Sequence, residues 1–167
     1  MIDDDGFLEE LRREFLAEGA SLLELWEESF LKLEETENKA EEISTIFRVA
    51  HSFNGGSSAV GYADMAAFAH IVEDLLSIIK KDPSILTTEI VSLLLKCGDA
   101  FKQKIAFLNG SDSTDWEITV LSFDLNDKLL MLGHSGGHQA PHAESSRPTP
   151  VVETAPEAEL TDEMKAD

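Results

Sequence analysis

The sequence predicts an all-α protein: an antiparallel bundle with a core of four helices and a fifth helix that follows them. Three observations support this fold class. Apolar residues recur at spacings of three, four or seven from the N-terminus to about residue 132. The connections between these periodic segments are short, which favours antiparallel neighbours. No segment shows the period-two alternation between turn residues that is typical of strands.

The first expected helix covers about residues 4–35, and the second about residues 39–58. Asp3, Asp4 and Asp5 provide a cap and favourable charge at the start of the first. Gly61 suits a left-handed stop after the second. The two apolar stripes consist of Leu8, Leu11, Phe15, Leu22, Trp26, Phe30 and Leu33, and of Ile43, Ile46, Phe47, Ala50 and Phe53.

The third expected helix covers about residues 63–81 and ends before Pro83, because the residue before a proline is disfavoured in helical geometry. The fourth begins after Thr87, a suitable N-cap, and ends at Asn109. The fifth is expected to begin near residue 114 or 115 and to end at Gly133. The three apolar stripes are Met65, Phe68, Val72, Leu75, Leu76 and Ile79; Ile90, Leu93, Leu94, Cys97, Phe101, Ile105 and Leu108; and Ile118, Leu121, Leu125, Leu129 and Leu132.

Residues 1–132 are therefore expected to form one helical domain, and residues 133–167 a flexible, acidic linker or tail. The tail has no aromatic residue and too little apolar area to offset the entropy of ordering it. Such a linker favours the interpretation that the chain is the front part of a larger protein. His134, His138 and His142 recur every four residues, but the glycines and proline among them argue against a metal-binding helix.

The charge balance excludes several classes of partner. Thirteen basic residues stand against 33 acidic ones, for a net charge of −20, which argues against binding to nucleic acid or to an anionic membrane. No apolar run approaches the length of a membrane span, and the acidic N-terminus is unlike a signal peptide. The single cysteine, Cys97, cannot form an intramolecular disulfide and fits a reducing compartment. We expect a cytoplasmic protein.

The segment from Ile46 to Gly56, IFRVAHSFNGG, carries the candidate chemistry. On a helical wheel, His51 lies about 120° from the centre of the apolar stripe and faces solvent. Gly55 follows one turn later and leaves a clearing beside the imidazole, although each glycine costs a helix interior roughly 1 kcal/mol. The pair Gly55-Gly56 would either admit a partner to His51 or simply end the helix. We interpret His51 as a phosphate carrier.

A nucleophilic histidine needs one free ring nitrogen and an acceptor that holds the proton of the other. Glu73 lies at the border of the apolar stripe of the third helix, and His70 lies three residues earlier. If the second and third helices pack antiparallel, Glu73 would reach His51. Its carboxylate would then hold the Nδ1 proton, leave Nε2 free to attack and stabilise the positive ring formed during transfer.

The run from Phe47 to Gly56 resembles the phosphorylation motif of histidine phosphotransfer (HPt) domains, most closely the N-terminal domain of CheA-type chemotaxis histidine kinases. The resemblance extends over most of residues 4–132 and implies a helical bundle of the HPt type. It implies that His51 is the phosphoacceptor, Glu73 the orienting carboxylate and His70 a supporting neighbour. The family usually has a lysine where this chain has Asn54, which brings no charge and favours slower phosphorylation or an atypical kinase.

The resemblance also implies partners. In such proteins a separate ATP-binding kinase domain phosphorylates the histidine, and an aspartate of a CheY-like or CheB-like response regulator receives the phosphoryl group. The chain shows no phosphate-binding loop of the G-x-x-x-x-G-K kind. We therefore expect a carrier that is not catalytic alone, without an intrinsic cofactor or metal, whose partner domains bring ATP and magnesium. A monomer is expected for the isolated domain.

Two alternatives remain beside a domain of a CheA-like kinase. One is a free-standing phosphorelay shuttle with the same chemistry. The other is a helical interaction module whose His51 is never phosphorylated. A carboxylate-bridged metal bundle would need paired Glu-x-x-His motifs on facing helices, whereas the chain has the reverse order once, from His70 to Glu73.

Overall fold

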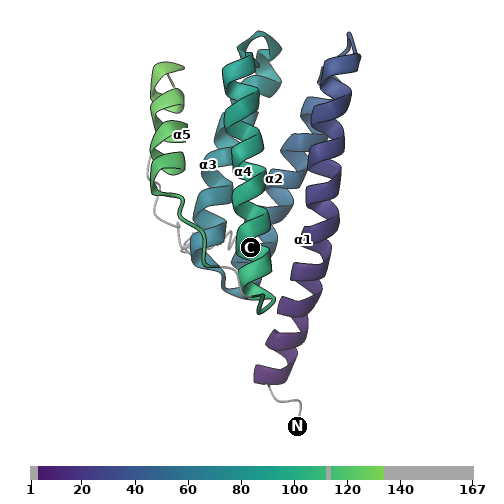
Figure 1. Ribbon diagram of the computed structural model, residues 1–167, viewed down its shortest axis with the longest axis vertical. Coiled ribbons are helices and arrows are strands. Elements are labelled where there is room, and N and C mark those ends of the chain that lie inside the picture. The colour runs from purple at the N-terminus through teal and green to yellow at the C-terminus, as the bar shows by residue number, and fades with distance from the viewer. Residues whose placement is uncertain (1–3, 112–113, 134–167) are drawn as a thin grey trace, which may run out of the picture. The chain divides into compact units, whose positions relative to one another are not determined.

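A computed structural model of the protein describes residues 4–111 and 114–133. Within these ranges the chain is helical, with no strand, and its four long helices form an antiparallel bundle to which a shorter fifth is added (Figure 1). The predicted fold class is confirmed. Most of the predicted tail, with its three histidines, and Asp3 lie outside the described residues. The helices are α1 (Asp4–Glu35), α2 (Ala40–Val60), α3 (Ala63–Lys81), α4 (Thr88–Leu108) and α5 (Thr119–Met131), and a 3-10 turn at Pro83–Ile85 lies between α3 and α4.

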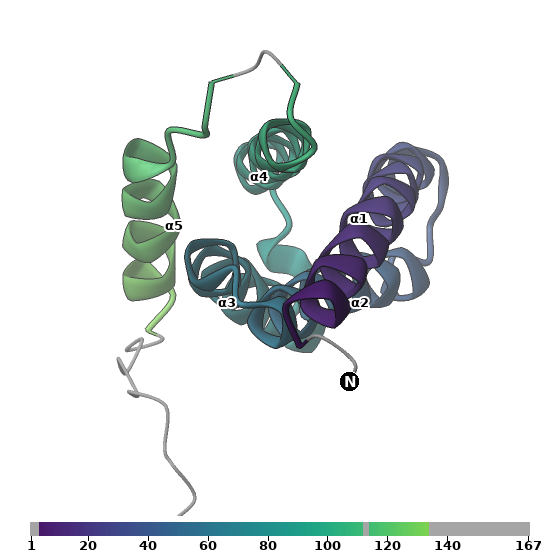
Figure 2. The same cartoon turned by 90° about the horizontal axis from the view of Figure 1, so that it is seen from below.

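Seen end-on, α1 to α4 surround one core, and α5 lies outside it against α3 and α4 (Figure 2). The core contains the fully buried side chains of Trp26, Phe53, Phe68 and Phe101. The rings of Phe53 and Phe101 are stacked at 4.6 Å, and Phe68 lies 5.2 Å from Phe101. These contacts tie α2, α3 and α4 together. No helix in the described ranges is long and apolar enough to cross a membrane.

A tight connection makes α2 and α3 an antiparallel pair. Gly61 adopts the predicted left-handed conformation, with φ of 83°, and its N–H lies at the carbonyls of Ser57 and Ser58. Tyr62 then donates its N–H to the Ser57 carbonyl at 2.8 Å. The helix α2 therefore continues to Val60, past the glycine pair, and the interpretation that these glycines end the helix is wrong. Thr87 caps α4 as predicted, accepting the N–H of Ile90 at 3.4 Å.

The start of α5 is at Thr119 and not near residue 114 as predicted. The Nζ of the buried Lys104 contacts a carboxylate oxygen of Asp64 at 2.6 Å and of Asp115 at 2.9 Å. Burial opposes the charge of this ammonium, but the two carboxylates outweigh it and raise the pKa of Lys104. Trp116 packs edge-on against the aromatic core. These contacts hold residues 114–118 as a non-helical connection.

Candidate functional site

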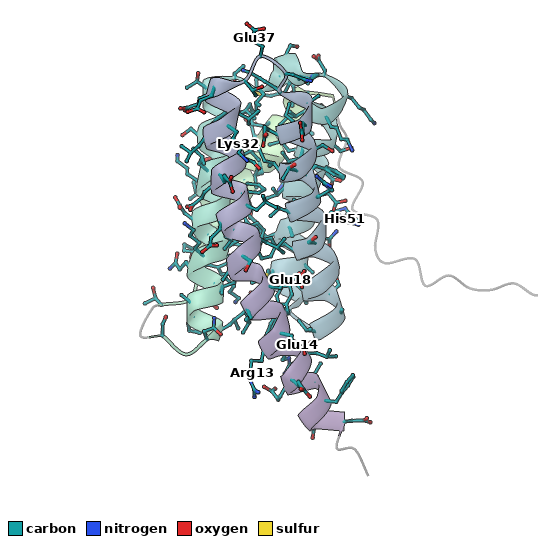
Figure 3. The ribbon with its side chains drawn as sticks, turned by 90° about the vertical axis from the view of Figure 1, so that its right-hand side faces the viewer. Arg13, Glu14, Glu18, Lys32, Glu37 and His51 are labelled. Atoms are coloured by element: carbon teal, nitrogen blue, oxygen red, sulfur yellow. The ribbon has the colours of Figure 1, made fainter. Side chains whose placement is uncertain are left out.

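His51 projects from the middle of α2, away from the bundle core (Figure 3). Its neighbours Val49, Ala50 and Phe53 are buried, so the helical period turns the imidazole outward. The side chain of His51 is 69% exposed. The solvent-facing position predicted from the helical wheel is therefore present.

The antiparallel packing of α2 and α3 brings Glu73 to His51. The Nδ1 of His51 lies 2.9 Å from the Oε1 of Glu73, whose side chain is only 18% exposed. A carboxylate oxygen accepts, so Nδ1 carries a ring proton, and in the neutral imidazole Nε2 then keeps a free lone pair. The imidazole thus presents a nucleophilic nitrogen while a carboxylate holds the other side of the ring.

Asn54 holds the second oxygen of the same carboxylate. It lies three residues after His51, and its Nδ2 donates to the Oε2 of Glu73 at 3.0 Å. The same amide nitrogen lies 3.3 Å from the Nδ1 of His70. The two oxygens of Glu73 are therefore engaged by different side chains of α2. Sequence reasoning noted that Asn54 brings no charge but missed this bridging position.

His70 belongs to the same network at one remove from His51. Since the Asn54 amide donates, the Nδ1 of His70 accepts and its proton is on Nε2. That Nε2 lies 3.6 Å from the Oδ2 of Asp74, one turn later on α3. His70 is linked to His51 through Asn54 and Glu73. The structure therefore places His70 beside Asn54, the second hydrogen-bond partner of the Glu73 carboxylate. Asp74 was not singled out from the sequence.

Phe47 and Lys80 form a second group beside His51. Phe47 lies one turn before His51 on α2, and the two rings are nearly parallel, with an interplanar angle of 12° and centroids 6.3 Å apart. The Nζ of Lys80 lies over the Phe47 ring, 4.8 Å from its centroid. Sequence reasoning placed Phe47 in the apolar stripe and gave Lys80 no role. The seven-residue interval from Glu73 to Lys80, about two turns of α3, was the available signal.

The two glycines after His51 face different surroundings. A Cβ at Gly55 would meet nothing within 4 Å, so this position is open as predicted. A Cβ at Gly56 would lie 2.6 Å from Cε2 of Phe15, because the Phe15 ring of α1 packs against it. The expectation that Gly56 is open to a partner is therefore wrong. Gly56 gives room to α1, and Gly55 alone leaves space on the outer face.

Alanine at these two positions is expected to have opposite effects on stability. Gly55→Ala should raise the free energy of unfolding by about 0.5–1 kcal/mol, because alanine favours the helix and meets no neighbour. Gly56→Ala should lower it by about 1–3 kcal/mol, because the Phe15 ring must shift. Urea denaturation followed by circular dichroism measures both. A change of the same sign in the two variants would contradict the assigned surroundings.

Comparison with known proteins adds a family. Residues 10–104, more than half of the chain, match the family model of the Hpt domain. Chemotaxis protein CheA of Borreliella burgdorferi is 34% identical over 98 residues, covering 59% of this chain and 11% of that protein. Chemotaxis protein CheA of Klebsiella aerogenes is 31% identical over 110 residues, covering 66% of this chain and 16% of that protein. The chain thus spans only a small part of the length of these curated relatives.

A solved structure is similar over the bundle. It is the phosphorylated P1 domain of CheA3 in complex with CheY6 from R. sphaeroides, with a TM-score of 0.62 and 27% identity. The alignment covers 73% of this chain and 97% of that chain. The match to the family model, the helical bundle and this likeness agree, and the chain belongs to the Hpt domain family.

Proposed function

We propose that this chain is the phosphoacceptor and phosphotransfer domain of a CheA-like two-component histidine kinase. The observation that carries the proposal is the 2.9 Å contact between Nδ1 of His51 and Oε1 of Glu73 on an exposed helix face. In the neutral imidazole this contact leaves the Nε2 lone pair free, on a side chain that is exposed to a visiting protein. Membership of the Hpt domain family and the similarity to CheA proteins support it.

The chemistry has two steps. In the first, the Nε2 lone pair of His51 attacks the γ-phosphorus of ATP held by a kinase domain, the bond to the leaving oxygen breaks, and ADP departs. Glu73 accepts the hydrogen bond from the Nδ1–H and stabilises the positive charge that develops on the ring. In the second, an aspartate oxygen of a response regulator attacks the phosphorus, and the electron pair of the P–N bond returns to Nε2.

The partners follow from this chemistry. Phosphoryl transfer is promoted chiefly by positioning and charge neutralisation, and the immediate surroundings of His51 supply one carboxylate and a neutral amide. The kinase domain would therefore bring ATP, magnesium and the catalytic groups, and a CheY-like or CheB-like regulator would receive the phosphoryl group. The proposal places the domain in the cytoplasm, where ATP is available, as a monomeric carrier that is not catalytic alone.

Phosphoramidate, a small phosphoryl donor for imidazoles, tests the site without a partner. The expected product is one acid-labile, base-stable phosphate per chain, detected by 31P NMR and intact mass. His51→Gln should abolish it, whereas His70→Gln, a second exposed histidine on the same face, should retain it. Label that persists in His51→Gln would overturn the assignment.

Transfer is tested with proteins. The labelled domain is mixed with a CheY-like regulator, and loss of phosphohistidine is followed together with gain of aspartyl phosphate. Labelling by ATP is measured with a CheA kinase core that lacks its own phosphoacceptor domain. Absence of label from both donors would favour the non-phosphorylated interaction module. A free-standing shuttle would share all of these results and differ in having no kinase domain on its own polypeptide.

A further inference from the structure

Phosphorylated His51 would place negative charge in an acidic setting. A phosphoryl group adds roughly 1.5 to 2 negative charges near pH 7. The Glu73 carboxylate already contacts the other ring nitrogen, and Asp74 follows it on α3. Asn54, at the position where HPt domains usually carry a lysine, engages Glu73 through a neutral amide. The phosphoryl group therefore needs a cation from elsewhere.

Lys80 is a cation that contacts the aromatic neighbour of His51. It lies about two turns after Glu73 on α3, on the same face of that helix. Its Nζ is 4.8 Å from the centre of the Phe47 ring, which is nearly parallel to the imidazole of His51. The ammonium and the imidazole thus share the Phe47 ring as a neighbour. Lys80 is exposed, so its cation–π contact is weak and the ammonium is free to exchange it for a stronger partner.

Two other basic side chains nearby are less suited. Arg48 lies three residues before His51, but its Nη2 is bonded to the Oγ1 of Thr45 at 3.2 Å, a further turn away from His51. Lys81 follows Lys80 and is also exposed, but it lies about 100° around the helix from it. Lys81 is therefore a matched control, because it has the same charge and length as Lys80 and is also exposed.

We propose that Lys80 is the phosphate-binding cation of this site. Once His51 is phosphorylated, the ammonium leaves the face of Phe47 and pairs with the phosphoryl oxygens. This inference rests on the proposed function, since it requires His51 to be the phosphoacceptor. It explains how a chain with asparagine at position 54 compensates for the missing charge. The cation comes from α3, where Lys80 contacts the Phe47 ring beside the histidine before phosphorylation.

The test uses the domain phosphorylated by phosphoramidate, with His51→Gln as the check that the label is on His51. The phosphoryl group is titrated by 31P NMR. A cation at contact distance favours the dianion, so Lys80→Gln should raise the pKa of the phosphoryl group. The expected change is about a two- to fivefold increase in the proton affinity of that group, which is about the effect of one charge at 4 Å in water. Lys81→Gln should change it by less than about 1.5-fold, and Lys80→Arg should restore the wild-type titration.

The outcomes separate the two proposals. Equal shifts in Lys80→Gln and Lys81→Gln would show a general field effect and overturn the role of Lys80. A shift in Arg48→Gln with none in Lys80→Gln would overturn it in favour of the guanidinium. Wild-type protein that takes no label on His51 would overturn the proposed function, and this inference with it. A labelled wild type with an unchanged Lys80→Gln titration would overturn this inference alone.

Discussion

Replacing Glu73 with alanine is expected to slow phosphorylation of His51 by about 10- to 100-fold. The carboxylate accepts a hydrogen bond from Nδ1, with an N···O distance of 2.9 Å, which fixes the tautomer and stabilises the charged ring during transfer. Without it, the ring rotates freely and part of the population carries its proton on Nε2, which cannot attack. The labelling rate of Glu73→Gln should fall between those of the wild type and Glu73→Ala, because the glutamine carbonyl oxygen still accepts a hydrogen bond from Nδ1 but carries no charge.

The rate of labelling by phosphoramidate measures this effect, and 15N NMR of the His51 ring reports the tautomer directly. Asp74→Ala is the matched control. It also removes one negative charge from α3, but the Asp74 carboxylate lies near His70. Its labelling rate should stay within about twofold of wild type. Equal slowing in the alanine variants of Glu73 and Asp74 would show that only net charge matters and would contradict a positioning role.

Phe101→Ala is expected to lower the free energy of unfolding by about 3–5 kcal/mol. The ring is fully buried, is stacked on Phe53 at 4.6 Å and contacts Phe68 at 5.2 Å. Its removal leaves a cavity where α2, α3 and α4 meet, and these large side chains cannot fill it. Because Phe53 lies on the opposite face of α2 from His51, the folded fraction should still be labelled at a near-normal rate.

Chemical denaturation in urea measures the loss, with labelling assayed well below the transition. Phe123→Ala is the control, since that ring is 71% exposed on α5 and should change the free energy of unfolding by less than about 0.5 kcal/mol. A similar loss in both variants would contradict the central position of Phe101 in the core.

Local signals predicted most of the helices. The bounds of α1 and α3 and the cap of α4 agree with the structure because aspartate, proline and threonine act within a few residues of where they stand. The predicted start of α5 was wrong because the contact between Lys104 and Asp115 and the packing of Trp116 determine where this helix begins. The expectation for Gly56 failed for the same kind of reason: the Phe15 ring, which comes from α1, occupies the space beside this glycine.

The candidate site divides along the same line. Periodicity and antiparallel packing were enough to place His51 in solvent and Glu73 within reach of it. They could not assign the bridging amide of Asn54 or the ammonium over Phe47, because those depend on side-chain rotamers and on the register between two helices. The functional roles of these side chains stay predictions for the experiments above.

Both oxygens of Glu73 are engaged in the unphosphorylated domain, one by the imidazole and one by the Asn54 amide. The nucleophile is thus assembled before any visitor arrives, and little rearrangement remains for the moment of encounter. The rate of phosphoryl transfer through such a carrier would depend on how often a kinase domain or response regulator reaches it. Tethering and local concentration would therefore control that rate. Specificity for one kinase domain or response regulator over another would then depend on the binding surfaces of those partner proteins.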